Sequence, residues 1–209
     1  LSTGFGSAEE VTIAVASNFT HPVKEIATAF QTQTGHKTRL IFGSSGKIFA
    51  QITHGAPFDV FLSADQAKPL TLVQDNLAVT DSRFTYAIGV LALWAPKTDH
   101  GLNYPDLQKT SVRKIALANP KLAPYGKAAQ QVLQALKLDQ TLAPKLVQGE
   151  NIAQTYQFIA SGNADMGFVS AAQLRPAQRG VWIVPAALHD PILQDAVLLK
   201  RAQDNSAAQ

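Results

Sequence analysis

Small polar residues gather at four points of this chain, each between an apolar stretch and a helical pattern. They are Ser17-Asn18 and Ser44-Ser45 in the first half, and the segments 119–126 and 150–152 in the second. Hydroxyl, amide and backbone N–H groups donate to anions, and a helix start adds about half a positive charge. No Lys or Arg lies at the centre of these turns. The predicted chemistry is therefore the binding of a small, fully deprotonated oxyanion by neutral donors.

A single turn of this kind carries little weight. Ser and Asn before a helix are more often ordinary N-caps than ligand contacts. Tyr125 and Phe158 could equally be core residues or walls of a cleft. Gly46 would let the backbone of its turn approach a neighbour closely. The prediction depends on several such turns, two from each half of the chain, meeting at one place.

Signatures of catalysis and of metal binding are weak. The segment 43–47 (GSSGK) is neither a phosphate loop, which needs four residues between its glycines, nor the Gly-x-Ser-x-Gly turn of hydrolases. The five histidines show no ligand spacing and there is no cysteine, so we expect no metal ligands and no cofactor. A serine hydrolase stays open as an alternative. It would require His21, His36 or His54 within about 3 Å of Ser44 or Ser45.

Composition indicates a folded protein with a large core. The chain has 209 residues, of which 46% are apolar and 16% charged, which excludes a disordered protein. The longest apolar run, 87–95, is far shorter than the ~20 residues of a membrane span. The net charge is only +3 and the basic residues are scattered, so we expect no nucleic-acid partner. Residues 1–10 lack the basic and apolar regions of a signal peptide, which indicates a cytosolic protein or a mature form.

The elements that must position these turns alternate between strand and helix. Apolar runs and helical spacing predict the first-half strands and helices in the order 11–16 (strand), 19–34 (helix), 39–42 (strand), 45–53 (helix), 60–62 (strand) and 64–76 (helix). This order is typical of a parallel sheet covered by helices, and ligands of such sheets bind at the carboxyl ends of the strands.

A long strand over 84–95 interrupts the alternation, and we expect it to leave one lobe and enter another. The elements predicted beyond it are strands 114–118, 145–148, 164–169, 181–184 and 195–200, with helices 125–138 and 152–160. We therefore predict two α/β lobes with a ligand cleft between them. The first lobe would contain residues 1–85 and 190–209, and the second residues 86–189.

Seven ordered segments of the chain resemble the periplasmic molybdate-binding proteins of ABC transporters. They are VASNF (15–19), FGSSG (42–46), GAPFDVFLSAD (55–65), SRFTYAIG (82–89), NPKLAPYG (119–126), GENIAQ (149–154) and DMGFV (165–169). The resemblance extends from about residue 11 to about residue 200. It implies the type II periplasmic binding-protein fold, in which two crossing strands join two lobes that close over the ligand.

The resemblance also implies a function and a set of ligand residues. Such a protein binds molybdate or tungstate as the intact oxyanion, without catalysis, and passes it to a membrane permease. The residues that would donate to the ion are Ser17 and Ser45 (hydroxyl and backbone N–H), and Asn18, Tyr125 and Ile152 (backbone N–H). Those that would support them are Ser44, Gly46, Pro124 and Asn151. A mature periplasmic monomer is the expectation that follows.

Two departures from the family pattern are visible. Some relatives place a Tyr hydroxyl on the ion at the position that is Ser170 here, so that contact is not expected. The family also usually continues with a C-terminal helical segment, of which 204–209 resembles the start. A sulfate or general oxyanion receptor of the same fold stays open as an alternative. Phosphate fits less well, because its proton requires a carboxylate acceptor, and only Glu150 borders one of the turns.

Overall fold

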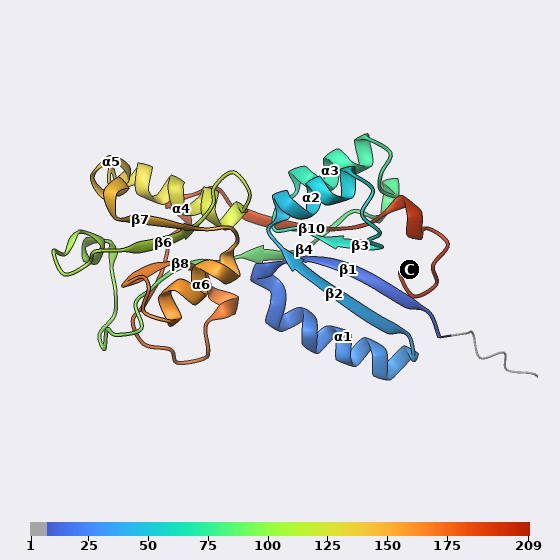
Figure 1. Ribbon diagram of the computed structural model, residues 1–209, viewed down its shortest axis with the longest axis horizontal. Coiled ribbons are helices and arrows are strands. Elements are labelled where there is room, and N and C mark those ends of the chain that lie inside the picture. Colours follow the sequence, from blue (N-terminus) through green and yellow to red (C-terminus); the bar gives the residue numbers. More distant parts are fainter. Residues whose placement is uncertain (1–7) are drawn as a thin grey trace, which may run out of the picture.

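The computed structural model describes residues 8–209, which form two α/β lobes, each built on a five-stranded sheet (Figure 1). In the first lobe the strand order is β2-β1-β3-β10-β4. These strands are β1 (Glu10–Ala16), β2 (Lys37–Gly43), β3 (Val60–Leu62), β4 (Phe84–Gly89) and β10 (Ile192–Leu198). The first three run parallel, and β10 runs antiparallel to both of its neighbours. The predicted parallel unit at the start of the chain is thus confirmed.

Three helices cover this sheet, with α1 on one face and α2 and α3 on the other (Figure 1). They are α1 (Thr20–Thr34), α2 (Ser45–Thr53) and α3 (Ala67–Gln74). Gly35 ends α1 with a left-handed φ of 76°, and its N–H bonds to Gln31 O at 3.0 Å. The helix predicted over 64–76 is shorter than expected. Pro69 lies in its first turn, where a missing N–H breaks no helical hydrogen bond.

The second lobe repeats the arrangement with strand order β7-β6-β8-β5-β9. Its strands are β5 (Leu91–Trp94), β6 (Ile115–Ala118), β7 (Leu146–Gly149), β8 (Met166–Ser170) and β9 (Val181–Ile183). Its helices are α4 (Pro124–Ala135), α5 (Asp139–Leu142) and α6 (Ile152–Ala160). Strands β6, β7 and β8 run parallel, and β5 runs antiparallel to β8 and β9. The short helix α5 was not predicted.

The long strand predicted over 84–95 is wrong in one respect, because it is interrupted at Val90. Before this residue β4 pairs with β10 in the first sheet, and after it β5 pairs with β8 and β9 in the second. The chain therefore does pass from lobe to lobe here, as expected. It returns between β9 and β10, through a 3-10 turn at Ala186–Leu188. The last strand is also wrong in its start, because β10 begins at Ile192 and not at Asp195.

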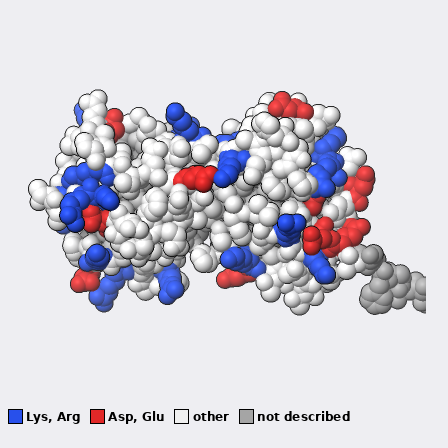
Figure 2. Space-filling view, in the orientation of Figure 1, with Lys and Arg blue, Asp and Glu red and all other residues white. Residues whose placement is uncertain are grey.

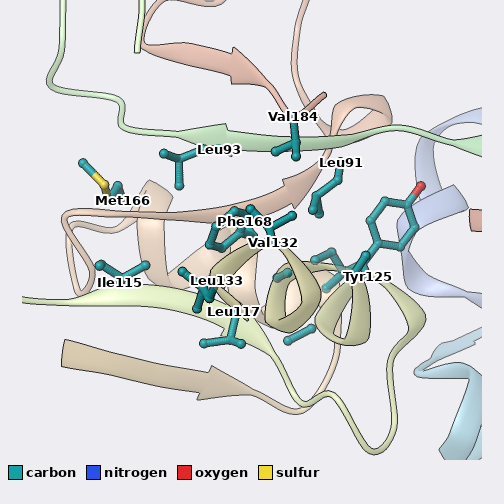
Figure 3. Close-up of a cluster of buried hydrophobic side chains, with 14 of the residues drawn as sticks. Leu91, Leu93, Ile115, Leu117, Tyr125, Val132, Leu133, Met166, Phe168 and Val184 are labelled. Carbon is teal, nitrogen blue, oxygen red and sulfur yellow. The ribbon is translucent and has the colours of Figure 1, made fainter. Parts of the chain in front are cut away.

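A large apolar core stabilises the second lobe. Phe168, Leu91, Leu93 and Ile115 are fully buried within it, and helix α4 contributes Val132 and Leu133 (Figure 3). Burial of each large apolar side chain contributes ~1.5–3 kcal/mol to stability. The cluster also includes Ala16, Ala64 and Ile192 of the first lobe. The apolar packing thus continues across the junction between the lobes.

The predicted lobe boundaries at 85/86 and 189/190 stay predictions. Strand pairing follows the first sheet as far as Gly89 and resumes it at Ile192. The expectation that residues 1–10 are not a signal peptide falls mainly on residues 1–7, which lie outside the described residues. Within residues 8–209, no helix combines the length and apolar character that a membrane crossing requires.

Candidate functional site

Four strands of the two sheets point their carboxyl ends at one small cavity between the lobes. Each of β1, β2, β6 and β7 leads into a turn that starts a helix. The cavity has a volume of only about 10 Å³, on a scale where a single water needs ~10–15 Å³, so a guest larger than one water requires the surrounding groups to move apart. Its lining residues are Ala16, Ser17, Asn18, Gly43, Ser44, Ser45, Ala64, Ala123, Pro124, Tyr125 and Ile152.

The first lobe contributes two turns with buried hydroxyls. A 3-10 turn, Ser17–Phe19, connects β1 to α1, and this replaces the α-helical start predicted at Phe19. Ser45 is the first residue of α2 and only 1% exposed. Its Oγ accepts a hydrogen bond from Ala64 N at 2.9 Å, so its own proton can be donated to a guest. Ser44 caps α2 by accepting from Lys47 N at 3.3 Å.

The second lobe contributes the starts of two helices. Pro124 occupies the first position of α4, which favours Pro because that N–H has no helical partner. Tyr125 follows it, and Ile152 is the first residue of α6. Backbone N–H groups at such positions have no acceptor one turn earlier. Asn151 caps α6 by accepting from Gln154 N at 3.0 Å.

The cavity lining is electrically neutral. None of the described residues that line it is charged. Glu150, in the turn before α6, forms an ion pair with Lys47 of the first lobe at 2.6 Å, and both side chains are about half exposed. Opposite charges are also adjacent at the junction of the lobes in Figure 2, and elsewhere on this face the two signs are interspersed. With no charged side chain in the lining, the helix starts at the cavity favour an anion.

The lobes touch on several sides of this cavity. Gly46 N donates to Leu122 O of the second lobe at 2.9 Å, and a Cβ at this glycine would lie 3.0 Å from Leu122 Cα. Ser17 Oγ lies 3.3 Å from Asn151 Oδ1 and 3.4 Å from Ala153 N. The close approach that Gly46 permits is thus between the two lobes. Gly46 and Asn151 do not line the cavity itself.

A buried polar network lies behind the cavity. Asn18 Nδ2 donates to Gln194 Oε1 at 2.8 Å, and Ser170 Oγ donates to Tyr125 Oη at 3.1 Å. The Tyr125 ring lies at the edge of the apolar cluster of the second lobe, and its hydroxyl points away from the other labelled side chains (Figure 3). Burial raises the pKa of both Tyr125 and Tyr86, so both phenols are neutral at physiological pH. The network adds no charge next to the cavity.

The hydrolase alternative requires a histidine bonded to Ser44 or Ser45. In the part of the chain that the structure describes, neither Ser44 nor Ser45 has a histidine as a hydrogen-bond partner. His36 and His54 instead bond to Glu9 N and Ala50 O. Among the described residues there is also no group of three or more His, Asp or Glu side chains that could hold a metal ion.

The sequence-predicted donors, Ser17, Asn18, Ser45, Tyr125 and Ile152, all lie around the cavity, and their role as ligands stays a prediction. Sequence reasoning missed Ala64, although it follows the carboxyl end of β3, which is the same signal that identified the other turns. It also missed Gln194. The only signal there was one amide within the apolar stretch 192–199.

A larger cavity lies elsewhere on the first lobe. This groove of 370 Å³ is bounded mainly by apolar side chains of α1 and its sheet, including Val23, Ile26 and Phe30. It offers few polar donors, so its lining does not match the small polar guest that the strand ends favour.

Comparison with known proteins agrees with the geometry, because the relatives found are solute-binding proteins. A family model described as bacterial extracellular solute-binding protein matches residues 11–209. The chain is 48% identical over 203 residues to the molybdate-binding protein ModA of Rhodobacter capsulatus, covering 97% of this chain and 81% of that relative. It is 46% identical over 211 residues to ModA of Azotobacter vinelandii, covering 97% and 82%.

A solved structure shares the whole architecture. The periplasmic molybdate-binding protein of Azotobacter vinelandii superimposes with a TM-score of 0.89 at 40% identity, covering 94% of this chain and 89% of that one. This likeness confirms the predicted periplasmic binding-protein fold with two α/β lobes. It also confirms the resemblance predicted from the seven sequence segments.

Proposed function

The chain belongs to the family of bacterial extracellular solute-binding proteins, and from this premise we propose that it binds molybdate between its lobes and delivers it to an ABC transporter. The observation that carries the proposal is the neutral cavity at which the starts of α2, α4 and α6 meet the 3-10 turn that precedes α1. Molybdate is a dianion with acceptors only, so it matches a lining of donors without a carboxylate. Tungstate has the same charge and the same set of acceptors, and we propose that it binds as well.

We propose that Ser17 and Ser45 donate their hydroxyls and backbone N–H groups, and that Asn18, Tyr125 and Ile152 donate backbone N–H groups. Ser45 keeps its proton free because its Oγ accepts from Ala64 N. Ser17 would turn its hydroxyl away from Asn151, to which it now donates at a long 3.3 Å. An ion held by both lobes stabilises their contact, because it is bound fully only when they meet.

Further properties belong to the same proposal. We propose that the chain acts without catalysis or cofactor, as a periplasmic monomer with no nucleic-acid partner. A sulfate or general oxyanion receptor is the second candidate, because sulfate offers the same acceptors and differs chiefly in size. The high identity to two molybdate-binding relatives favours molybdate.

Thermal unfolding with added oxyanions tests the proposal. Molybdate or tungstate at about 100 times its Kd adds about 2.7 kcal/mol, which raises the Tm by roughly 5–10 °C for a chain of this size. Sulfate and phosphate at the same concentration are expected to shift the Tm much less. An equal shift with sulfate would favour a general oxyanion receptor, and no shift with any of the four would contradict the proposal.

The pair Lys47–Glu150 leads to a prediction about rates. Both charges stand beside the cavity and join the lobes at 2.6 Å, but exposed pairs contribute only ~0–1 kcal/mol. Lys47→Gln should slow association, because it leaves Glu150 unpaired to repel the dianion. Glu150→Gln should speed association, because it leaves Lys47 unpaired, and should change the Kd by only about threefold. Both variants should speed release, because both remove the ion pair that joins the lobes. Stopped-flow measurements at low and high salt check this, since screening should shrink both effects. Identical association rates for the two variants at low salt would show that the pair does not act on the ion.

A further inference from the structure

One buried amide lies at the point where β10 returns the chain to the first lobe. Gln194 is 2% exposed, and the register of β10 against β4 shifts directly after it. Where the register of a strand is irregular, a side chain need not follow the regular alternation between the two faces of the sheet. The amide of Gln194 consequently needs hydrogen-bond partners among the surrounding side chains.

The partners of Gln194 come from both halves of the candidate site. Its Oε1 accepts from Asn18 Nδ2 at 2.8 Å and from Tyr86 Oη at 3.2 Å, which lie after β1 and on β4 of the first sheet. Its Nε2 donates to Tyr125 Oη of the second lobe at 3.4 Å. Asn18 and Tyr125 both line the cavity. One side chain thus touches a lining residue from each side.

The backbone of the first crossing segment is shaped to admit this contact. A Cβ at Gly89 would lie 2.4 Å from Tyr125 Oη and 2.9 Å from Gln194 Nε2. The space that a side chain would fill at position 89 is therefore occupied by these two polar groups. Tyr125 and Gln194 therefore meet beside Gly89, where the chain passes from the first sheet to the second.

We infer that Gln194 is a positioning residue, which holds the Asn18 turn and the α4 start at the spacing that a bound oxyanion requires. The inference rests on the proposed function. Gln194 does not line the cavity and would act only through Asn18 and Tyr125. Loss of the amide should therefore loosen the two half-sites relative to each other, so that the ion is released faster.

Two substitutions test the link from its two ends. Gln194→Leu keeps a side chain of similar size without hydrogen bonds, and Tyr125→Phe removes only the hydroxyl while keeping the backbone N–H. Each is expected to raise the molybdate Kd about tenfold, mainly through faster release, as for the loss of roughly 1.4 kcal/mol. Gln31→Leu is the matched control. Gln31 accepts from Thr38 N at 3.1 Å on the exposed side of the first lobe, far along α1 from the cavity.

Isothermal titration and the molybdate-induced rise in Tm separate positioning from mere stability. A structural role would lower the Tm of ligand-free and ligand-bound protein equally and leave the rise unchanged. Positioning predicts a smaller rise in both variants and an unchanged rise in Gln31→Leu. Should Gln194→Leu fail to fold, Tyr125→Phe still decides the matter. Unchanged Kd values in a wild type that binds molybdate would overturn this inference alone, whereas a wild type that does not bind would overturn it together with the proposed function.

Discussion

Replacing Ser45 by aspartate is expected to abolish molybdate binding in a chain that still folds. The side chain at this position is 1% exposed and lines the cavity, so a carboxylate there would face the dianion directly. Two unit charges ~4 Å apart interact by about 4 kcal/mol at an effective dielectric constant of ~20. Against a dianion this repulsion should raise the Kd by at least ~1,000-fold. Isothermal titration measures it.

The fold should survive this change for local reasons. Residue 45 is the first of α2, where a negative charge is favoured by the helix dipole, and a carboxylate can still accept from Ala64 N. Ser111→Asp is the matched control, because it adds the same charge at an exposed position. It should bind as the wild type does. A Ser45→Asp variant that keeps its affinity would show that the ion binds elsewhere.

Gly126→Ala is expected to lower the stability of the chain strongly. In most helix interiors this substitution is favourable by ~0.5–1 kcal/mol. At this glycine, however, a Cβ would lie 2.1 Å from Ala118 O, a backbone atom at the end of β6. Helix α4 must then move away from its sheet, and overpacking of this kind costs about 3 kcal/mol. The free energy of unfolding in urea should fall by that amount.

The same displacement should weaken ion binding, because Tyr125 precedes Gly126 and its N–H is one of the proposed donors. Gly101→Ala is the control, since nothing lies within 4 Å of a Cβ there and its φ is ordinary. That variant should match the wild type in stability and in Kd. If Gly126→Ala proved as stable as the wild type, the tight contact between α4 and β6 would be incorrect.

Periodicity along the chain predicted most of the fold. The parallel unit of the first lobe and helix α6 lie where apolar spacing placed them. The break at Val90 could not be predicted, because residues 84–95 are equally suited to one strand or two. The partner of each half is decided by strands far away in the chain. The start of β10 was predicted three residues too late, because the polar pair Gln194-Asp195 within an apolar run resembles a strand boundary. The register shift of β10 against β4 lies at this same pair.

The turns of the candidate site and their meeting in a cleft between the lobes were predicted from the sequence, but the side-chain and backbone contacts that join the lobes there were not. Local sequence identifies a helix start, and the rule that ligands bind at strand ends places several starts at one edge. Sequence does not give the distance between two lobes. The contact of Gly46 with Leu122 and the bridge from Asn18 through Gln194 to Tyr125 depend on that distance. Both therefore required the structure.

Crystallography with molybdate bound tests the central claim most directly. The anomalous signal of molybdenum locates the ion without reference to the rest of the map. We expect one strong peak between the lobes, within hydrogen-bond distance of the Ser17 and Ser45 hydroxyls and of the Tyr125 and Ile152 backbone N–H groups. A peak at another place, or no peak from crystals soaked well above the measured Kd, would contradict the account.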